Sequence, residues 1–206
     1  MDTIYKSDTK RVFLTFDDGP SPVTSKILDI LKQENVKATF FILGSNVDSR
    51  KDVVKRMYEE GHYLANHGYS HTYSKIYSSP QSVLDEYNEC NDKVKNAIEV
   101  PDYNSHLFRF PGGLAGGKYA EIKKEAKELL LQNNIVNVDW NALTGDAETN
   151  NLSVEFEMTR LTETMESKNS LVILMHDAAA KSVTADALPQ IIAKLKEEGY
   201  EFKNFY

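Results

Sequence analysis

Short apolar runs rich in β-branched and aromatic residues alternate with amphipathic segments along the 206 residues of the chain. The apolar residues of the amphipathic segments recur at helical spacing, for example over 23–35, 48–61 and 187–199. Strands that alternate with helices form a parallel sheet covered by helices. Six or seven such units predict an α/β fold, either an incomplete β/α barrel or an open doubly wound sheet. The predicted strands are 12–16, 38–43, 62–66, 107–110, 135–140, 171–176 and, more weakly, 201–205.

Composition limits the possible partners of the chain. The 24 basic and 31 acidic side chains give a formal net charge of −7, and no basic run interrupts this excess. Such a chain is a poor candidate for binding nucleic acid or anionic lipid. Its apolar runs are shorter than the roughly 20 residues that span a bilayer. No repeat or linker divides the chain, so we expect one domain over 1–206. We also expect no membrane segment, no nucleic-acid partner and a monomer.

The first ten residues, MDTIYKSDTK, are polar and lack the layout of a secretory signal. Two locations therefore stay open: the cytoplasm, or the cell wall outside it for a chain cut free of its export signal. The single cysteine, Cys90, cannot form a disulfide within the chain. It shares one face of the helical pattern over 81–98 with Val83, Tyr87, Val94 and Ile98, so it is predicted to fill the core.

Polar residues gather where the predicted strands end. Each has a structural explanation of its own, such as a turn at Asp17-Asp18-Gly19 or a surface ion pair for Arg109. In both architectures, however, the carboxyl ends of parallel strands share one edge, where active sites lie. The conjunction of these residues therefore predicts an active site. They are Asp17, Asp18, His67, His71, Arg109, Asp139, Trp140, Asp146 and His176.

Asp17 and Asp18 are adjacent carboxylates, which repel each other and are costly to bury without a positive partner. Asp18, His67 and His71 supply one carboxylate and two imidazoles, a ligand set for a divalent metal that keeps positions open for water and substrate. Such a cation offsets the repulsion and lowers the pKa of a bound water towards ~7. Asp17 is then free to accept a proton, so the residues predict hydrolytic chemistry.

The order and spacing of these motifs resemble the polysaccharide deacetylases of the NodB-homology type, carbohydrate esterase family 4, over essentially the whole chain. The resemblance implies a distorted (β/α) barrel with a seven-stranded parallel core. TFDDGP resembles the first motif, which implies that Asp17 is the catalytic base and Asp18 a metal ligand. HGYSH resembles the second motif, which implies that His67 and His71 are the other metal ligands.

RFPGG resembles the third motif, which implies that Arg109 orients the base and that the backbone N–H of Gly112 helps to bind the oxyanion. LMH resembles the fifth motif, which implies that Leu174 walls the acetyl pocket and that His176 is the general acid. We expect Arg109 to keep the base Asp17 ionised.

The fourth motif departs from the family pattern, which usually ends in Asp-Trp, because this chain reads DWNALTGDA. We assign the aspartate that tunes His176 and favours its imidazolium form to Asp146, with Asp139 as the second choice.

Two glycines are further departures. Gly68 stands where the family usually has a Ser or Thr that steadies the loop, and Gly112 stands where an aromatic residue is common. Trp140 is expected to replace that aromatic surface. Tyr69, Tyr73 and Tyr77 have two open interpretations, stacking on sugar rings or ordinary packing.

The resemblance implies a metal-dependent hydrolase that removes N-acetyl groups from a glycan. Zn²⁺ is the family's usual ion, and the same ligands accept Co²⁺ or Ni²⁺. We expect peptidoglycan N-acetylglucosamine or N-acetylmuramic acid as substrate, with chitooligosaccharides and exopolysaccharides as alternatives. Two other classes are a two-histidine, one-carboxylate Fe(II) oxygenase and a non-catalytic glycan-binding module. The β/α alternation disfavours the first, and the set Asp17, Arg109 and His176 disfavours the second.

Overall fold

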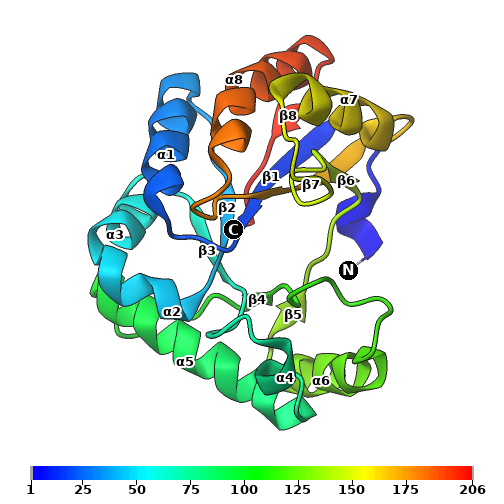
Figure 1. Cartoon of the computed structure of the whole chain (residues 1–206). Helices are drawn as coiled ribbons and strands as arrows, with labels where there is room; N and C mark the ends of the chain where they lie inside the picture. Colours follow the sequence, from blue (N-terminus) through cyan, green and yellow to red (C-terminus); the bar gives the residue numbers. More distant parts are fainter. Residues whose placement is uncertain (1, 206) are drawn as a thin grey trace.

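In the computed structural model, which describes residues 2–205, eight parallel strands form one sheet that curls around an interior of its own (Figure 1). Seven strands follow each other in the order β5-β4-β3-β2-β1-β7-β6, and β8 pairs with the start of β1. This arrangement confirms the predicted incomplete barrel with a seven-stranded parallel core. The strands are β1 Arg11–Asp17, β2 Thr39–Ile42, β3 Tyr63–Asn66, β4 Leu107–Phe108, β5 Val136–Asn137, β6 Ala142–Leu143, β7 Ser170–His176 and β8 Glu201–Phe202.

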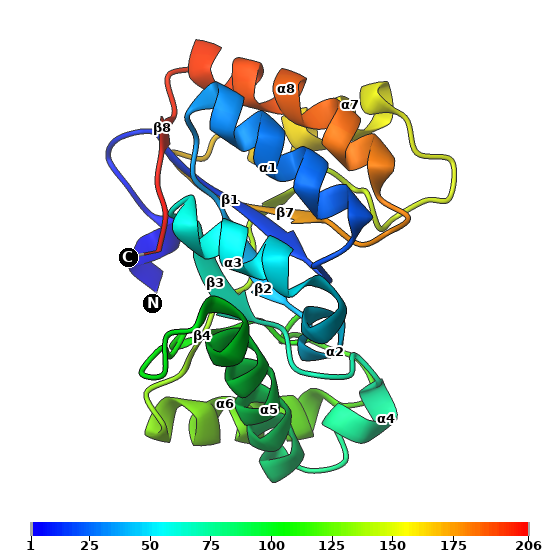
Figure 2. The ribbon, with the colours of Figure 1, turned by 90° about the vertical axis from the view of Figure 1, so that its left-hand side faces the viewer.

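The helices lie outside the sheet, with α1, α7 and α8 on one side, α5 and α6 on the other, and α3 between them (Figure 2). The helical patterns over 23–35, 48–61 and 187–199 are confirmed as α1, as η2 with α3, and as the second half of α8. Among the described residues, no helix has both the length and the apolar character that crossing a membrane requires. The helices are η1 Asp2–Tyr5, α1 Pro22–Glu34, α2 Gly44–Val47, η2 Asp48–Arg50, α3 Lys51–Glu59, α4 Tyr73–Ile76, α5 Pro80–Ile98, α6 Ala120–Gln132, α7 Val154–Met165 and α8 Ser182–Glu197.

Helix α5 confirms the pattern predicted over 81–98. Its N-terminus is capped by Ser79, whose Oγ accepts a hydrogen bond from the backbone N–H of Ser82, and Pro80 occupies the first helical turn. Cys90 is fully buried, and its thiol donates a hydrogen bond to the carbonyl of Ile42. Burial raises the pKa of this thiol, so Cys90 fills the core as predicted.

Strands β4, β5 and β6 differ from the sequence prediction. Strand β4 ends at Phe108, two residues early, and β5 covers only two of the six residues predicted over 135–140. Strand β6 was not predicted, because two residues are too few for a period-2 pattern. Strands β5 and β6 lie at the two ends of the strand order, where each pairs with one neighbour only. With a neighbouring strand on one side only, β5 and β6 have shorter regular segments.

Alternation of side chains along β1 and β7 divides the core into two parts, because successive residues of a strand point to opposite faces. Phe13 and Val172 belong to an apolar cluster inside the barrel, and Thr15, Asp17, Leu174 and His176 follow on the same faces at steps of two. The alternate residues pack in the larger core that includes the helices: Val12, Leu14, Phe16, Leu171, Ile173 and Met175. The barrel interior is therefore apolar at its base and polar at the carboxyl ends of the strands.

The carboxyl ends of the strands lie away from the two chain ends. In Figure 2 the arrow of β1 points away from η1 and β8, towards the loops that lead into α1, α2 and α4. Strands β1 and β7 pair in register from Arg11 with Ser170 to Asp17 with His176. This register brings two of the predicted site residues to the same level at that edge.

Candidate active site

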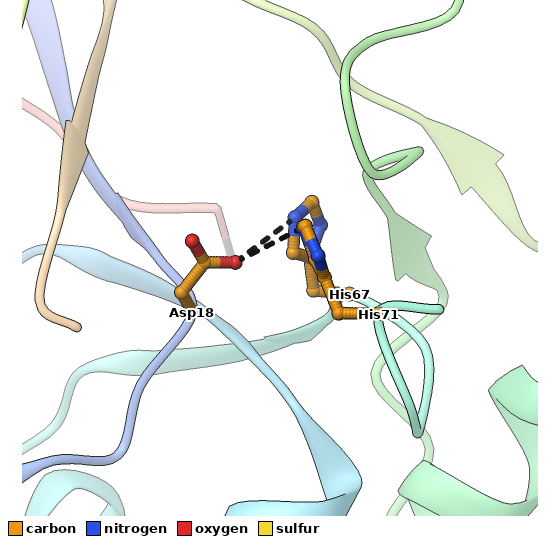
Figure 3. Close-up of side chains that lie close together, drawn as sticks. All are labelled: Asp18, His67 and His71. Carbon is orange, nitrogen blue, oxygen red and sulfur yellow. Dashed lines mark ion pairs between the residues drawn. The ribbon is translucent and has the colours of Figure 1, made fainter. Parts of the chain in front are cut away.

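Asp18, His67 and His71 meet beyond the carboxyl ends of β1 and β3 (Figure 3). Asp18 Oδ1 lies 3.5 Å from His67 Nε2 and 3.4 Å from His71 Nε2, and one ligand atom from each residue lies within 4.8 Å of the others. Tetrahedral ligands that are each about 2.0–2.1 Å from a zinc ion are roughly 3.3–3.4 Å apart. Both Asp18–histidine distances are therefore close to the spacing of ligands that share a divalent cation.

The electronic state of these groups also fits a cation. The carbonyl of Arg109 can only accept, so His67 Nδ1–H donates to it at 2.7 Å and Nε2 carries the lone pair. Burial lowers the pKa of His67 to about 3, which keeps the imidazole neutral. Asp18 Oδ1 is buried and accepts no hydrogen bond from the described residues. A neutral imidazole and an unpartnered carboxylate oxygen are the donors that a metal ion selects.

Two of the three candidate ligands have a strained backbone. Asp18 has φ +74° and His71 has φ +54°, both in the left-handed region that non-glycine residues seldom adopt. Such conformations cost on the order of 1–3 kcal/mol each and concentrate at functional sites. The side-chain amide of Asn46 donates to the carbonyl of Asp18 at 3.0 Å, which holds the first of them in place.

Glu86 of α5 fastens the loop that carries both histidines. Its Oε2 accepts hydrogen bonds from the backbone N–H groups of Tyr69 at 2.8 Å and Ser70 at 2.7 Å, and its Oε1 accepts from Ser70 Oγ at 2.5 Å. The side chain is buried. Sequence reasoning missed Glu86, although a signal existed: it is a charged residue on the apolar face of α5, between Val83 and Cys90.

Gly68 does not leave this loop loose. It has φ +83°, and a Cβ at this position would lie 2.9 Å from Ile76 Cδ1. Its N–H donates to Asn66 Oδ1 at 2.9 Å. Glycine thus fits a tight, left-handed position, and Asn66 and Glu86 provide the hydrogen bonds that a Ser or Thr at 68 was expected to supply.

Replacing Glu86 by alanine is expected to weaken Zn²⁺ binding by about 10–100-fold, because outer-shell partners orient metal ligands. Isothermal titration of Zn²⁺ into the metal-depleted variant measures the effect. Glu89→Ala, an exposed carboxylate on the same helix, is the matched control. Equal Zn²⁺ affinities for the two variants would contradict this role for Glu86.

Asp17 and Arg109 form a buried ion pair beside the candidate cation site. Arg109 Nη1 donates to Asp17 Oδ1 at 2.7 Å, and the guanidinium carbon lies 3.9 Å from the centre of the Phe41 ring. Burial raises the pKa of Asp17, and the charge of Arg109 opposes this without cancelling it. We expected Arg109 to dominate; complete burial of the carboxyl is the reason that it does not. The guanidinium also donates to Val138 O at 2.9 Å, Asp139 O at 3.0 Å and Thr15 Oγ1 at 2.8 Å.

His176 is paired with Asp146, the first of the two aspartates considered. His176 Nδ1 lies 2.8 Å from Asp146 Oδ1, and the backbone N–H of His176 donates to Asp146 Oδ2 at 2.7 Å. Burial lowers the pKa of His176, but the hydrogen bond and charge of Asp146 outweigh it and raise the pKa to about 9. Asp139 lies elsewhere, where its Oδ2 accepts from the N–H of Leu114. The geometry gives His176 the protonated state that a proton donor needs.

A second buried carboxyl group, Glu157 of α7, lies beneath Asp146. Thr184 Oγ1 is 3.1 Å from Asp146 Oδ2 and 3.2 Å from Glu157 Oε1. Burial, and then the charge of Asp146, raises the pKa of Glu157 to about 7. Sequence reasoning missed it, although it stands in phase with Leu161 and Met165, the buried residues of α7.

The raised pKa of Glu157 makes stability depend on pH. The folded protein holds the Glu157 proton more tightly than the unfolded chain, in which the pKa of this group is 4.5. Its contribution to the free energy of unfolding is therefore complete below pH 4.5 and is lost as pH rises through about 7. Glu157→Gln is expected to match the wild type at pH 5 and to be more stable at pH 8.5 by roughly 2–3 kcal/mol. Urea unfolding at both pH values measures this. Glu155→Gln, exposed on the same helix, is the control, and a gain independent of pH would contradict the prediction.

The surface beside the third motif differs from the expectation. Gly112 has φ +75°, and a Cβ there would lie 2.5 Å from the hydroxyl oxygen of Tyr73. Tyr73, whose ring centre is 5.6 Å from that of His71, therefore occupies the space beside Gly112. Trp140 packs against Gly113 instead, 2.9 Å from its would-be Cβ. The aromatic neighbour of Gly112 is therefore Tyr73 of α4 rather than Trp140, whose ring packs against the next glycine.

Of the remaining predicted residues, Leu174 lies in the barrel wall, and Tyr73 and Tyr77 lie in and directly after α4. Leu174 points to the interior of the barrel, two residues before His176 on β7, and is 9% exposed, which leaves it at the base of the polar region. Tyr77 is fully buried, and its hydroxyl donates to the carbonyl of Pro111 at 2.7 Å. Tyr77 is thus a core residue, whereas Tyr73 is 40% exposed beside the candidate ligands.

The motif residues thus lie together at one edge of the sheet, with the distances given above. A family profile described as Polysaccharide deacetylase matches residues 5–132. The chain belongs to the polysaccharide deacetylase family. A peptidoglycan-N-acetylglucosamine deacetylase of Bacillus cereus is 34% identical to this family member over 97% of the chain and 70% of the relative. PgdA of Listeria monocytogenes, a peptidoglycan-N-acetylglucosamine deacetylase, is 36% identical over 94% of the chain.

Solved structures of the family are similar over the full chain. A Streptococcus mutans CE4 esterase superposes with a TM-score of 0.90 at 35% identity, covering 100% of this chain and 90% of that one. The catalytic domain of a peptidoglycan N-acetylglucosamine deacetylase from Eubacterium rectale gives a TM-score of 0.87 at 31% identity, covering 100% and 94%. The deacetylase chain spans 66% of its Bacillus subtilis relative YheN and 37% of the Listeria enzyme.

Proposed function

We propose that this polysaccharide deacetylase removes N-acetyl groups from peptidoglycan, at N-acetylglucosamine or N-acetylmuramic acid, in a metal-dependent hydrolysis. The observation that carries the proposal is the grouping of Asp18, His67 and His71, with the candidate base Asp17 next to Asp18 in sequence and the candidate acid His176 in register with Asp17 on β7. The relatives named for peptidoglycan support the choice of glycan. We propose Zn²⁺ as the ion, with Co²⁺ or Ni²⁺ as alternatives for the same ligands.

Each step of the reaction has a candidate residue. A divalent cation held by Asp18, His67 and His71 would supply Lewis acidity for a water molecule and for the acetamide carbonyl. Asp17, which Arg109 holds in position, accepts a proton as the water oxygen bonds to the carbonyl carbon.

The backbone N–H of Gly112 is the candidate donor to the oxyanion that forms on the carbonyl oxygen. An amine leaves poorly unless it is protonated, so His176 donates a proton to the nitrogen as the C–N bond breaks. The products are acetate and a glycan with a free amine.

Acetate release from a panel of glycans tests the proposal. The panel holds N-acetylated peptidoglycan fragments, chitooligosaccharides and an acetylated exopolysaccharide. We expect acetate from the peptidoglycan fragments, a loss of at least about 100-fold after chelation and recovery when Zn²⁺ is restored, since both hydroxide formation and carbonyl polarisation need the ion. Glycan binding without acetate release would favour a binding module, and oxygen consumption with Fe(II) and a 2-oxo acid would favour an oxygenase. Acetate release that chelation leaves unchanged would contradict metal dependence.

A further inference from the structure

A cavity of about 430 Å³ opens beside the candidate cation site. Asp18 and His71 form part of its lining, so it is continuous with the ligand set. The segment between β2 and α3 supplies another part, through Asn46, Ser49 and Arg50. A glycan whose acetyl group reaches the cation site therefore has room to extend past Arg50.

Arg50 differs from the other four arginines of the chain in having no partner among the residues that the structure describes. Within residues 2–205, no carboxylate, carbonyl or hydroxyl oxygen is hydrogen-bonded or ion-paired to its guanidinium, although the residue is half-buried. The other four donate to oxygens: Arg11 to Thr3 O, Arg56 to Asp29 Oδ1, Arg109 to Asp17 Oδ1 and Arg160 to Glu148 Oε2. The guanidinium nitrogens of Arg50 are not among the buried unpaired polar atoms of the described residues, so they are open to solvent and to a ligand in the cavity.

Two carboxylates lie two residues from Arg50 along the chain, and within residues 2–205 neither is paired with it; Asp52, on its C-terminal side, is exposed. Asp48, two residues before it, is paired with Lys93 and lies 3.5 Å from Lys51 Nζ. Asp18, across the cavity, belongs to the candidate ligand set. Arg50 is therefore available to an acceptor carried by a ligand in the cavity.

Arg50 is an unbalanced positive charge at the cavity. Asp17 and Asp146 already have the counter-charges of Arg109 and His176. Among the described residues that line the cavity, Arg50 is the only Lys or Arg side chain. Arginine also matches the planar geometry of a carboxylate with two parallel hydrogen bonds.

We propose that Arg50 binds a carboxylate carried by the glycan next to the sugar that loses its acetyl group. The preferred substrate is then an acidic N-acetylated glycan, such as one with a lactyl ether carboxylate, rather than a neutral polymer. A single guanidinium suits a monoanion better than a dianionic phosphate. This inference rests on the proposed function and specifies its substrate.

Three matched tetrasaccharides test the inference: one of alternating N-acetylglucosamine and N-acetylmuramic acid with free lactyl carboxylates, the same compound with these groups converted to methyl amides, and neutral N-acetylchitotetraose. Arg50→Gln is expected to lower kcat/KM for the acidic compound by about tenfold to thirtyfold, the loss typical of one charged hydrogen-bonded contact that water partly screens. For both neutral compounds the change is expected to stay within about twofold. Arg50→Lys is expected to recover part of the loss, and Lys51→Gln, the neighbouring cation, is expected to change none of the three.

Binding separates this inference from the proposed function. Calorimetry on the Asp17→Asn protein compares the acidic and amidated tetrasaccharides, with and without Arg50→Gln. Tighter binding of the acidic compound that Arg50→Gln removes supports the inference, even if the wild type releases no acetate and the proposed function is wrong. Acetate release by the wild type with equal effects of Arg50→Gln on acidic and amidated compounds, or with no effect, overturns the inference and leaves the proposed function standing. Binding of neither compound also overturns it.

Discussion

Asp17→Asn is expected to lower kcat for acetate release by at least about 10³-fold while the protein still binds Zn²⁺, because the amide cannot accept the proton that a general base removes. The substitution keeps the size of the side chain and its contact with Arg109, and the candidate ligands Asp18, His67 and His71 stay unchanged. Acetate release measures the rate, and isothermal titration with Zn²⁺ measures the affinity for the ion. Thermal unfolding reports the cost of leaving the Arg109 charge buried without its counter-charge.

Asp139→Asn is the control for this substitution. It removes a carboxylate from the same region, where Asp139 accepts a hydrogen bond from Leu114 and its carbonyl accepts one from Arg109. Its rate is expected to stay close to that of the wild type. Near-normal turnover in Asp17→Asn would show that Asp17 is not the base, and loss of Zn²⁺ would show that Asp17 acts as a ligand instead.

His176→Ala is expected to affect amides and activated esters differently. An amine needs a proton to leave, so kcat/KM for an N-acetylated glycan is expected to fall by about 10²–10⁴-fold. The p-nitrophenolate of an acetyl ester leaves without one, so its rate is expected to fall less than about tenfold. Both substrates are assayed with the same Zn²⁺-loaded protein. Equal losses on the two substrates would exclude His176 as the acid.

The pH profile offers a second test of the same residue. Because the pKa of His176 is raised to about 9, the acid form is present below that pH, and the rate on the amide is expected to fall as pH rises through about 9. Asp146→Asn removes the negative charge that helps to raise this pKa, so the fall is expected at lower pH. If the rate of Asp146→Asn fell at the same alkaline pH as that of the wild type, the effect of Asp146 on His176 would be contradicted.

The sequence by itself determined the secondary-structure frame and the place of the chemistry. Period-2 and helical patterns report which face of each element is buried, and this local property was sufficient for β1, β2, β3, β7 and the helices α1, α3, α5 and α8. Parallel strands carry their active sites at their carboxyl ends, so DDG, HGYSH and LMH were predicted to share one edge before any contact was known.

Only the tertiary structure decided which partner each group has. Asp146 rather than Asp139 reaches His176, Tyr73 rather than Trp140 lies beside Gly112, and Glu86 supports the histidine loop. These contacts join residues of different elements, and the local pattern does not encode the distance between them. The same holds for β6, whose two residues gain strand geometry from pairing with β7. Hydrogen bonds and buried charges depend on packing across the whole barrel, whereas periodicity depends only on the segment that carries it.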